Sequence, residues 1–172
     1  MANLILINAE KLREMHTKIH EAFNIKAHGP EHEAAAKAFH EAYDSLAFPG
    51  GLSQALEKLK NHDPSIIDEI IFFLKENPDY FRSGYHKEEM LRRLKSFVFN
   101  KSQESLLASL IIRSIDEGPG RLFSAYARLS RKIDYNLLSV EIKKRLKSNK
   151  PEIQRRALHI HDLYLENKSR KI

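Results

Sequence analysis

Histidine offers this chain its widest choice of chemistry, because an imidazole can bind a metal ion or move a proton near neutral pH. Nine histidines occur among 172 residues. His16 and His20 lie one helical turn apart, and so do His28 and His32. Two imidazoles at this spacing can chelate one metal ion.

Two His–Glu pairs, at 32–33 and 40–41, begin like the helix motif of zinc proteases. That motif needs a second histidine at its fifth position, where this chain has Ala36 and Asp44. We therefore interpret the histidines as side chains on polar helix faces. The sequence predicts no metal, no cofactor and no catalytic residue.

Arg156 and His161 are separated by four residues. An imidazole can transfer protons at a phosphodiester while a guanidinium stabilises the developing charge. This spacing resembles the signature of HEPN ribonucleases, all-helical proteins in which arginine and histidine act at an RNA backbone. The resemblance implies an RNA-binding, RNA-cleaving function that uses Arg156 and His161, and we keep it as an alternative.

Positive charge is concentrated in the second half of the chain. Residues 1–80 hold 8 Lys and Arg against 13 Asp and Glu, a net charge of −5, whereas residues 81–172 hold 21 against 10, a net charge of +11. Such a surplus is typical of a surface that meets an acidic partner. The predicted basic face consists of Lys143, Lys144, Arg145, Arg155 and Arg156, and a second cationic cluster consists of Arg121, Arg128, Arg131 and Lys132.

Three aromatic side chains surround an arginine in the segment 79–85, which is expected to join two helices. Tyr80, Phe81 and Tyr85 flank Arg82 there. Rings in a connecting segment can simply fill the gap between two helices. Tyrosine and arginine also dominate binding hot spots. We therefore include Arg82, as an anion anchor, and Tyr85, as a stacking residue, among the predicted partner-binding residues.

Helices must position all of these side chains, because no segment alternates apolar and polar residues over the length of a strand. Apolar residues at three- and four-residue spacing predict about nine helices and an all-α fold. Asp63 is expected to cap a helix that Asn77 ends, and its apolar body, 66–74, is expected at the centre of the fold. Further helices are expected to begin near Ser83, with Val98 on its apolar face, and at Ser102.

Residues 150–158, Lys-Pro-Glu-Ile-Gln-Arg-Arg-Ala-Leu, are similar to the second-helix signature of HEAT-like repeats. The segment 63–74 resembles a looser copy of it, and alternate helices begin roughly 30 to 38 residues apart. The resemblance implies a short α-solenoid of stacked helix pairs, a family in which most members bind other macromolecules. An irregular orthogonal helical bundle is the alternative fold.

The composition indicates how many domains to expect and which kinds of chemistry are excluded. With 42% hydrophobic and 30% charged residues, the chain is expected to form one domain over 1–172, with acidic helices over 1–60 and HEAT-like pairs over 61–172. The absence of cysteine excludes thiolate catalysis, disulfides and cysteine-ligated zinc. The apolar run 4–7 is too short for a membrane span or a secretory signal, so we expect a cytoplasmic protein without membrane contact.

The sequence thus predicts a non-enzymatic interaction module that docks an acidic macromolecule through its basic C-terminal half. An acidic protein surface is the preferred partner and a nucleic acid is the alternative. The oligomeric state stays open.

Overall fold

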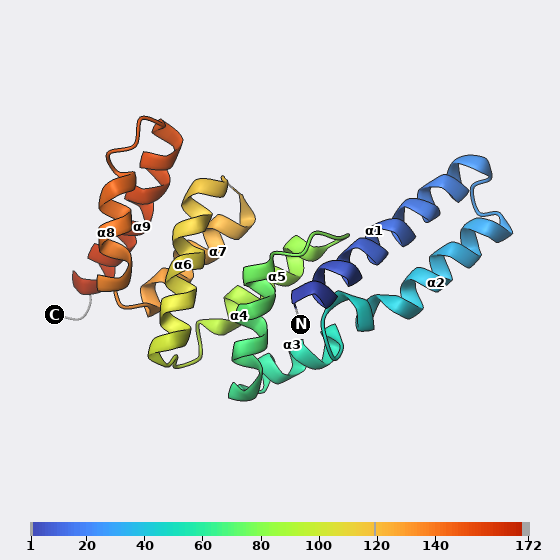
Figure 1. Cartoon of the computed structure of the whole chain (residues 1–172), viewed down its shortest axis with the longest axis horizontal. Helices are drawn as coiled ribbons and strands as arrows, with labels where there is room; N and C mark the ends of the chain where they lie inside the picture. The colour runs from blue at the N-terminus through green and yellow to red at the C-terminus, as the bar shows by residue number, and fades with distance from the viewer. Residues whose placement is uncertain (1, 119, 170–172) are drawn as a thin grey trace. The chain divides into compact units, whose positions relative to one another are not determined.

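The computed structural model describes residues 2–118 and 120–169, and over these residues the chain forms nine α-helices, two short 3-10 helices and no strand (Figure 1). This confirms the all-α prediction. The predicted domain span of 1–172 also includes residues 1, 119 and 170–172, which lie outside the described residues. Among the helices of the described chain, none combines the length and the apolar character that crossing a bilayer requires.

The chain divides into two compact units, Met1–His86 and Lys87–Ile172, which we call unit 1 and unit 2. The boundary falls inside helix α5 (Ser83–Leu94). Unit 1 holds 9 Lys and Arg against 13 Asp and Glu, and unit 2 holds 20 against 10. The change in the sign of the charge therefore coincides with the boundary between two separately packed units.

Unit 1 begins with a hairpin of two long helices, α1 (Ala2–Ile25) and α2 (Pro30–Ala47), which run side by side (Figure 1). Pro30 occupies the first turn of α2, where its missing N–H removes no helical hydrogen bond. His28 adopts a left-handed backbone in the short turn, with φ of 58°. The N-terminal part of α1 also packs against α4 (Ile67–Glu76) and buries Ile5 and Leu12.

The core of unit 1 centres on α4, as its apolar sequence predicted. Helix α3 (Leu52–Lys60) and the 3-10 helix η1 (Pro64–Ile66) directly precede α4 in the chain. Asp63 caps η1 because its Oδ1 accepts a hydrogen bond from the Ser65 amide at 2.9 Å, which also holds the pKa of Asp63 below its usual range. Asn77 ends α4 in a left-handed conformation. The α4 side chains that are at most 2% exposed are Ile67, Ile70, Ile71, Phe73 and Leu74.

Unit 2 is built from α6 (Lys101–Glu117), α7 (Arg121–Leu129), the 3-10 helix η2 (Ser130–Lys132), α8 (Asn136–Arg145) and α9 (Pro151–Ser169), together with the rest of α5. Helix α6 packs against α7, α8 and α9, and α9 also packs against α7, η2 and α8. The interior is aliphatic, with Leu107, Ile111, Leu129, Ile142 and Ile160 at or below 1% exposure. Unit 2 therefore has a hydrophobic core of its own.

Candidate functional site

Cationic side chains gather around one cavity of about 460 Å³ in unit 2, which we call the basic cavity. Lys95 follows α5, Arg128 lies in the last turn of α7, Arg131 and Lys132 belong to η2, and His159 lies on α9. Four cations and an imidazole from four parts of the chain therefore meet at one place. Of the described residues that line this cavity, none is acidic.

Helical periodicity explains why these side chains face the cavity. In α7 the buried positions are Ala125, Tyr126, Ala127 and Leu129, whereas Ser124 and Arg128, one turn apart, are exposed and both line the cavity. In α9, His159 and Leu163 are likewise one turn apart and both line the cavity. The aliphatic interior thus fixes the helices, and the helices turn these polar side chains outward.

The cations of the basic cavity differ in their neighbours. Arg131 forms an ion pair with Glu166 of α9, with 3.1 Å between Nη2 and Oε2. Arg128 and Lys132 are exposed, whereas Lys95 and Arg131 are half-buried. Partial burial strengthens the attraction of these charges for an anion, because less water screens them. The cavity is therefore suited to receive a carboxylate or a phosphate.

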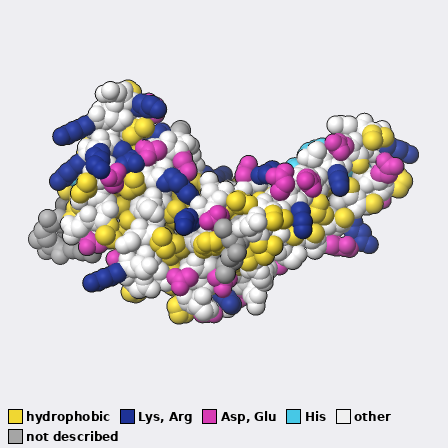
Figure 2. All heavy atoms as spheres, in the orientation of Figure 1, with side chains coloured by type: hydrophobic (Ala, Val, Ile, Leu, Met, Phe, Trp, Pro, Cys, Tyr) yellow, Lys and Arg dark blue, Asp and Glu magenta, His cyan; other side chains and the backbone are white. Residues whose placement is uncertain are grey.

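Three of the predicted basic-face residues are exposed in unit 2. These are Lys143 and Lys144 of α8 and Arg155 of α9. Lys144 is paired with Glu141, with 2.6 Å between Nζ and Oε1, and this bond holds the pKa of Glu141 below its usual range. Figure 2 shows several lysine and arginine side chains over the part of unit 2 that contains α8 and α9.

The other two predicted basic-face residues hold unit 2 together. Arg145 is 19% exposed and forms ion pairs with Asp116 of α6 and with Glu141. Arg156 is 7% exposed, and its Nε–H donates to the carbonyl oxygen of Ile115 at 2.6 Å. The structure places Arg156 in the interior of unit 2. None of the five predicted basic-face residues lines the basic cavity, so the docking site proposed below does not include them.

The predicted loop residues Arg82 and Tyr85 belong to unit 1. Arg82 has a left-handed backbone, with φ of 66°, and its guanidinium carbon lies 5.3 Å from the centre of the Phe81 ring. Tyr85, in the first turn of α5, is 59% exposed. Tyr80 is buried, and its hydroxyl donates to the carbonyl oxygen of Ala47 at 2.9 Å, so this ring does fill a gap between helices.

Sequence reasoning missed two members of the basic cavity, Lys95 and His159. Of the second cationic cluster it named, Arg128, Arg131 and Lys132 do meet there. Arg121 instead pairs with Glu88 of α5, with 3.2 Å between Nη1 and Oε2. No spacing in the sequence signals that α9 or the end of α5 would join this cluster, because the meeting depends on how the helices pack.

The remaining sites considered from the sequence are also placed by the structure. His161 Nδ1 lies 2.6 Å from the Tyr135 hydroxyl, and Tyr135 stacks on Tyr164 with 3.8 Å between ring centres. Arg156 and His161 therefore both form hydrogen bonds within unit 2, to the Ile115 carbonyl and the Tyr135 hydroxyl. Over residues 2–118 and 120–169, no group of three His, Cys, Asp or Glu side chains could hold a metal ion.

No protein-family model, curated protein or solved structure matches this chain. Its function is therefore inferred from the geometry of its own residues.

Proposed function

We propose that the protein is a non-enzymatic interaction module in which unit 2 docks an acidic segment of a partner protein at the basic cavity. The observation that supports this most directly is the meeting of Lys95, Arg128, Arg131 and Lys132 around one cavity lined by no described acidic residue. A glutamate or aspartate side chain of the partner fits such a cavity, because a carboxylate is bound best by several cations that are partly shielded from water.

The lining of the cavity favours a protein over a single-stranded nucleic acid. Proteins that bind single strands place aromatic rings beside the cations so that bases can stack on them. The described lining residues include no Phe, Tyr or Trp; the imidazole of His159 is their single ring, and their apolar member is Leu163. A peptide with an acidic side chain and a neighbouring aliphatic side chain matches this composition better than an unpaired base does.

The order of helix packing in unit 2 supports the HEAT-like interpretation. The consecutive helices α6 and α7 pack together, and so do α8 and α9. In addition, α6 packs on α8 and α7 packs on α9, so each helix of one pair also meets its counterpart in the next. Stacked helix pairs in an α-solenoid have this order of neighbours. We propose that unit 2 is a two-pair stack of this kind.

Binding of a fluorescein-labelled deca-glutamate peptide, followed by fluorescence anisotropy at about 150 mM salt, tests the docking proposal. The variant Arg128→Glu/Lys132→Glu reverses two exposed charges of the basic cavity. The matched control Lys143→Glu/Arg155→Glu makes the same change in net charge on exposed residues of α8 and α9. We expect the cavity variant to lose at least about tenfold in affinity and the control at most about threefold.

Equal losses in the two variants would mean that only the net charge matters, and would contradict docking at the cavity. Circular dichroism would first establish that both variants keep the helix content of the parent chain. A labelled single-stranded RNA, titrated in parallel at several salt concentrations, distinguishes the alternative partner. If the RNA binds more tightly than the peptide at about 150 mM salt, with a steep salt dependence, the nucleic-acid alternative replaces this proposal.

A further inference from the structure

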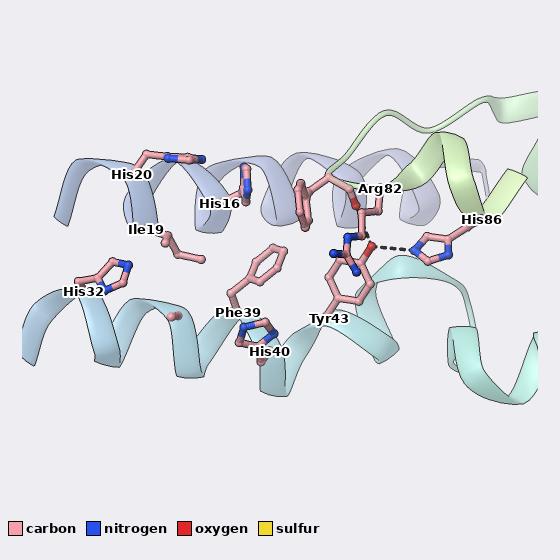
Figure 3. Close-up of a pocket in the computed structure, with 11 residues that line it drawn as sticks. His16, Ile19, His20, His32, Phe39, His40, Tyr43, Arg82 and His86 are labelled. Carbon is pink, nitrogen blue, oxygen red and sulfur yellow. Dashed lines mark hydrogen bonds between the residues drawn. The ribbon is translucent and has the colours of Figure 1, made fainter. Parts of the chain in front are cut away.

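A second cavity, of about 480 Å³, lies in unit 1 between α1 and α2. It is lined by residues of both helices and by the segment 81–86, all within Met1–His86. Figure 3 shows side chains from α1 and α2 facing this space from opposite sides, with Arg82 and His86 at one end. Its volume is in the range of small-molecule sites.

Rings form most of the wall of this cavity. His16 stacks on Phe81, with 4.4 Å between ring centres and 18° between ring planes. Phe39 lies against both, at 5.7 Å from His16 and 6.2 Å from Phe81, and its ring points into the space between the helices (Figure 3). Tyr43 adds a further ring at 5.2 Å from Phe39. A flat aromatic molecule finds ring contacts here, which stabilise pairs of rings beyond simple burial.

The charge in the lining has one sign. Arg82 contributes a guanidinium, and the described residues that line the cavity include no aspartate or glutamate. Burial, with the neighbouring His20 acting in the same direction, holds the pKa of His16 below its usual 6.5. Burial and the charge of Arg82 do the same to the pKa of His86. These two imidazoles are therefore neutral at pH 7, and Arg82 supplies a permanent positive charge.

Two further features mark the polar part of the lining. Arg82 holds its left-handed backbone although it is not glycine, a conformation that costs about 1 kcal/mol or more and that is concentrated at functional sites. His32 Nδ1 is buried and has no hydrogen-bond partner within the protein. A buried ring nitrogen without a partner costs free energy unless a bound molecule satisfies it. The cavity thus offers a cation held on a strained backbone, and a buried imidazole without a hydrogen-bond partner belongs to its lining.

We propose that the cavity between α1 and α2 binds a small planar aromatic carboxylate, with its ring against Phe39 and Phe81 and its carboxylate on the guanidinium of Arg82. A guanidinium matches a carboxylate with two parallel hydrogen bonds, and a single cation balances a single negative charge. Arg82 is the single permanent cation among the described residues of the lining, which suits one carboxylate. This site is independent of the docking function proposed for unit 2.

The test compares three probes that share one ring system and differ in charge: 2-naphthoate, the neutral 2-naphthamide and the cationic 2-naphthylmethylammonium. Each is titrated into the full chain at pH 7.5 by isothermal calorimetry. We expect 2-naphthoate to bind at least about tenfold more tightly than either of the others, because only it forms the charged pair with Arg82. Amide shifts in ¹H–¹⁵N spectra should move at residues 16, 39 and 81–86.

Substitutions at Arg82 separate the contribution of the charge from that of the rings. Arg82→Gln should lower the affinity for 2-naphthoate about tenfold and change the affinity for 2-naphthamide by less than about twofold. The affinity of Arg82→Lys for 2-naphthoate should lie between those of Arg82→Gln and the parent. Lys18→Gln, which removes an exposed cation of α1 outside the cavity lining, is the matched control and should change neither.

Three results would overturn the proposal. The first is the absence of binding by 2-naphthoate up to about 1 mM, which corresponds to a negligible affinity for a site of this size. The second is equal affinity for 2-naphthoate and 2-naphthamide, which would mean that the cavity binds aromatic rings but does not distinguish their charge. The third is an Arg82→Gln variant that binds 2-naphthoate as tightly as the parent. The comparison of probes on the parent chain decides the matter even if the variant folds poorly.

Discussion

Arg145 of α8 donates two parallel hydrogen bonds to Asp116 of α6, from Nε to Oδ1 at 3.0 Å and from Nη2 to Oδ2 at 2.6 Å. The same guanidinium donates from Nη1 to Glu141 Oε2 at 2.7 Å, one turn back on its own helix. Because each contact uses a different edge of the planar group, Arg145 joins two helices while its side chain stays 19% exposed. Arg145, which was expected to contact a partner, thus forms its ion pairs within unit 2.

This bridge predicts a measurable energetic coupling between the two residues. In a double-mutant cycle of Arg145→Met and Asp116→Ala, we expect a coupling of about 1 kcal/mol, since the pair is bidentate and partly shielded from water. The free energy of unfolding is measured with urea by circular dichroism. The control pair, Lys37 and Glu41 on α2, has side chains 77% and 67% exposed and 3.9 Å between charges, and should couple by about 0.3 kcal/mol. Equal coupling in both pairs would contradict the structural role.

Arg156 is predicted to stabilise unit 2 far more than its sequence neighbour Arg155. Its Nε–H satisfies the carbonyl of Ile115, one of the last carbonyls of α6, which has no partner within that helix. Arg156→Ala leaves this carbonyl without its donor and removes a buried side chain, so we expect a loss of about 2 kcal/mol in urea unfolding. Arg155→Ala, on the exposed side of the same turn, is the control. Its free energy of unfolding should stay within about 0.5 kcal/mol of that of the parent.

If the two alanine variants lose the same stability, Arg156 contributes no specific bond and the geometry at Ile115 is irrelevant to folding. Binding measurements on the same variants extend the comparison. Arg155→Ala should leave deca-glutamate binding within about twofold of the parent, because its side chain does not line the basic cavity.

Unit 1 is predicted to lose stability as the pH falls below neutrality. The unfolded chain protonates His16 and His86 near 6.5, whereas the folded chain holds the pKa of both below that value, chiefly through burial. The stabilising contribution is therefore complete above pH 6.5 and decreases as the pH falls towards the folded pKa values. We expect a lower urea midpoint at pH 5.5 than at pH 7.5, a range above that in which most carboxylates are protonated.

The variant His86→Gln isolates the part of this effect that comes from one imidazole. Tyr43 and Tyr80 face His86, with ring centres at 5.9 and 6.3 Å, and Arg82 adds a positive charge nearby. Gln keeps a hydrogen-bonding group but cannot be protonated in this range, so the difference between the two urea midpoints should shrink. A variant with the same pH dependence as the parent would show that His86 does not contribute to it.

The helices could largely be predicted from the sequence because their ends carry local signals. Asp63 and Asn77 delimit η1 and α4 as expected, and α5 does begin at Ser83. The start of α6 was placed at Ser102, but Asn100 is its N-cap, in a capping box with Gln103. Val98 was assigned to an apolar face and is 91% exposed, since α5 ends at Leu94.

The functional surfaces were less accessible to sequence reasoning, for a physical reason. Adjacent cations such as Arg155 and Arg156 are chemically identical, and only the direction of the side chain separates a binding residue from a structural one. One signal was present: Ile153, Arg156 and Ile160 share the apolar spacing of α9, which points Arg156 inward. The cavity between α1 and α2 was signalled only in part. Arg82 and its neighbour Phe81 stood out in the segment 79–85, but their meeting with Phe39 of α2 depends on tertiary packing.

The Tyr43 hydroxyl has a single proton and two neighbours, the Phe81 carbonyl oxygen at 2.7 Å and His86 Nε2 at 2.8 Å. A carbonyl can only accept, so the proton of Tyr43 goes to Phe81 and His86 must donate from Nε2. The neutral ring is thus fixed as the Nε2–H tautomer, and acid adds its proton at Nδ1. Protonation therefore leaves both hydrogen bonds intact, and what destabilises the acid form is chiefly the burial of the new charge, with the positive charge of Arg82 acting in the same direction.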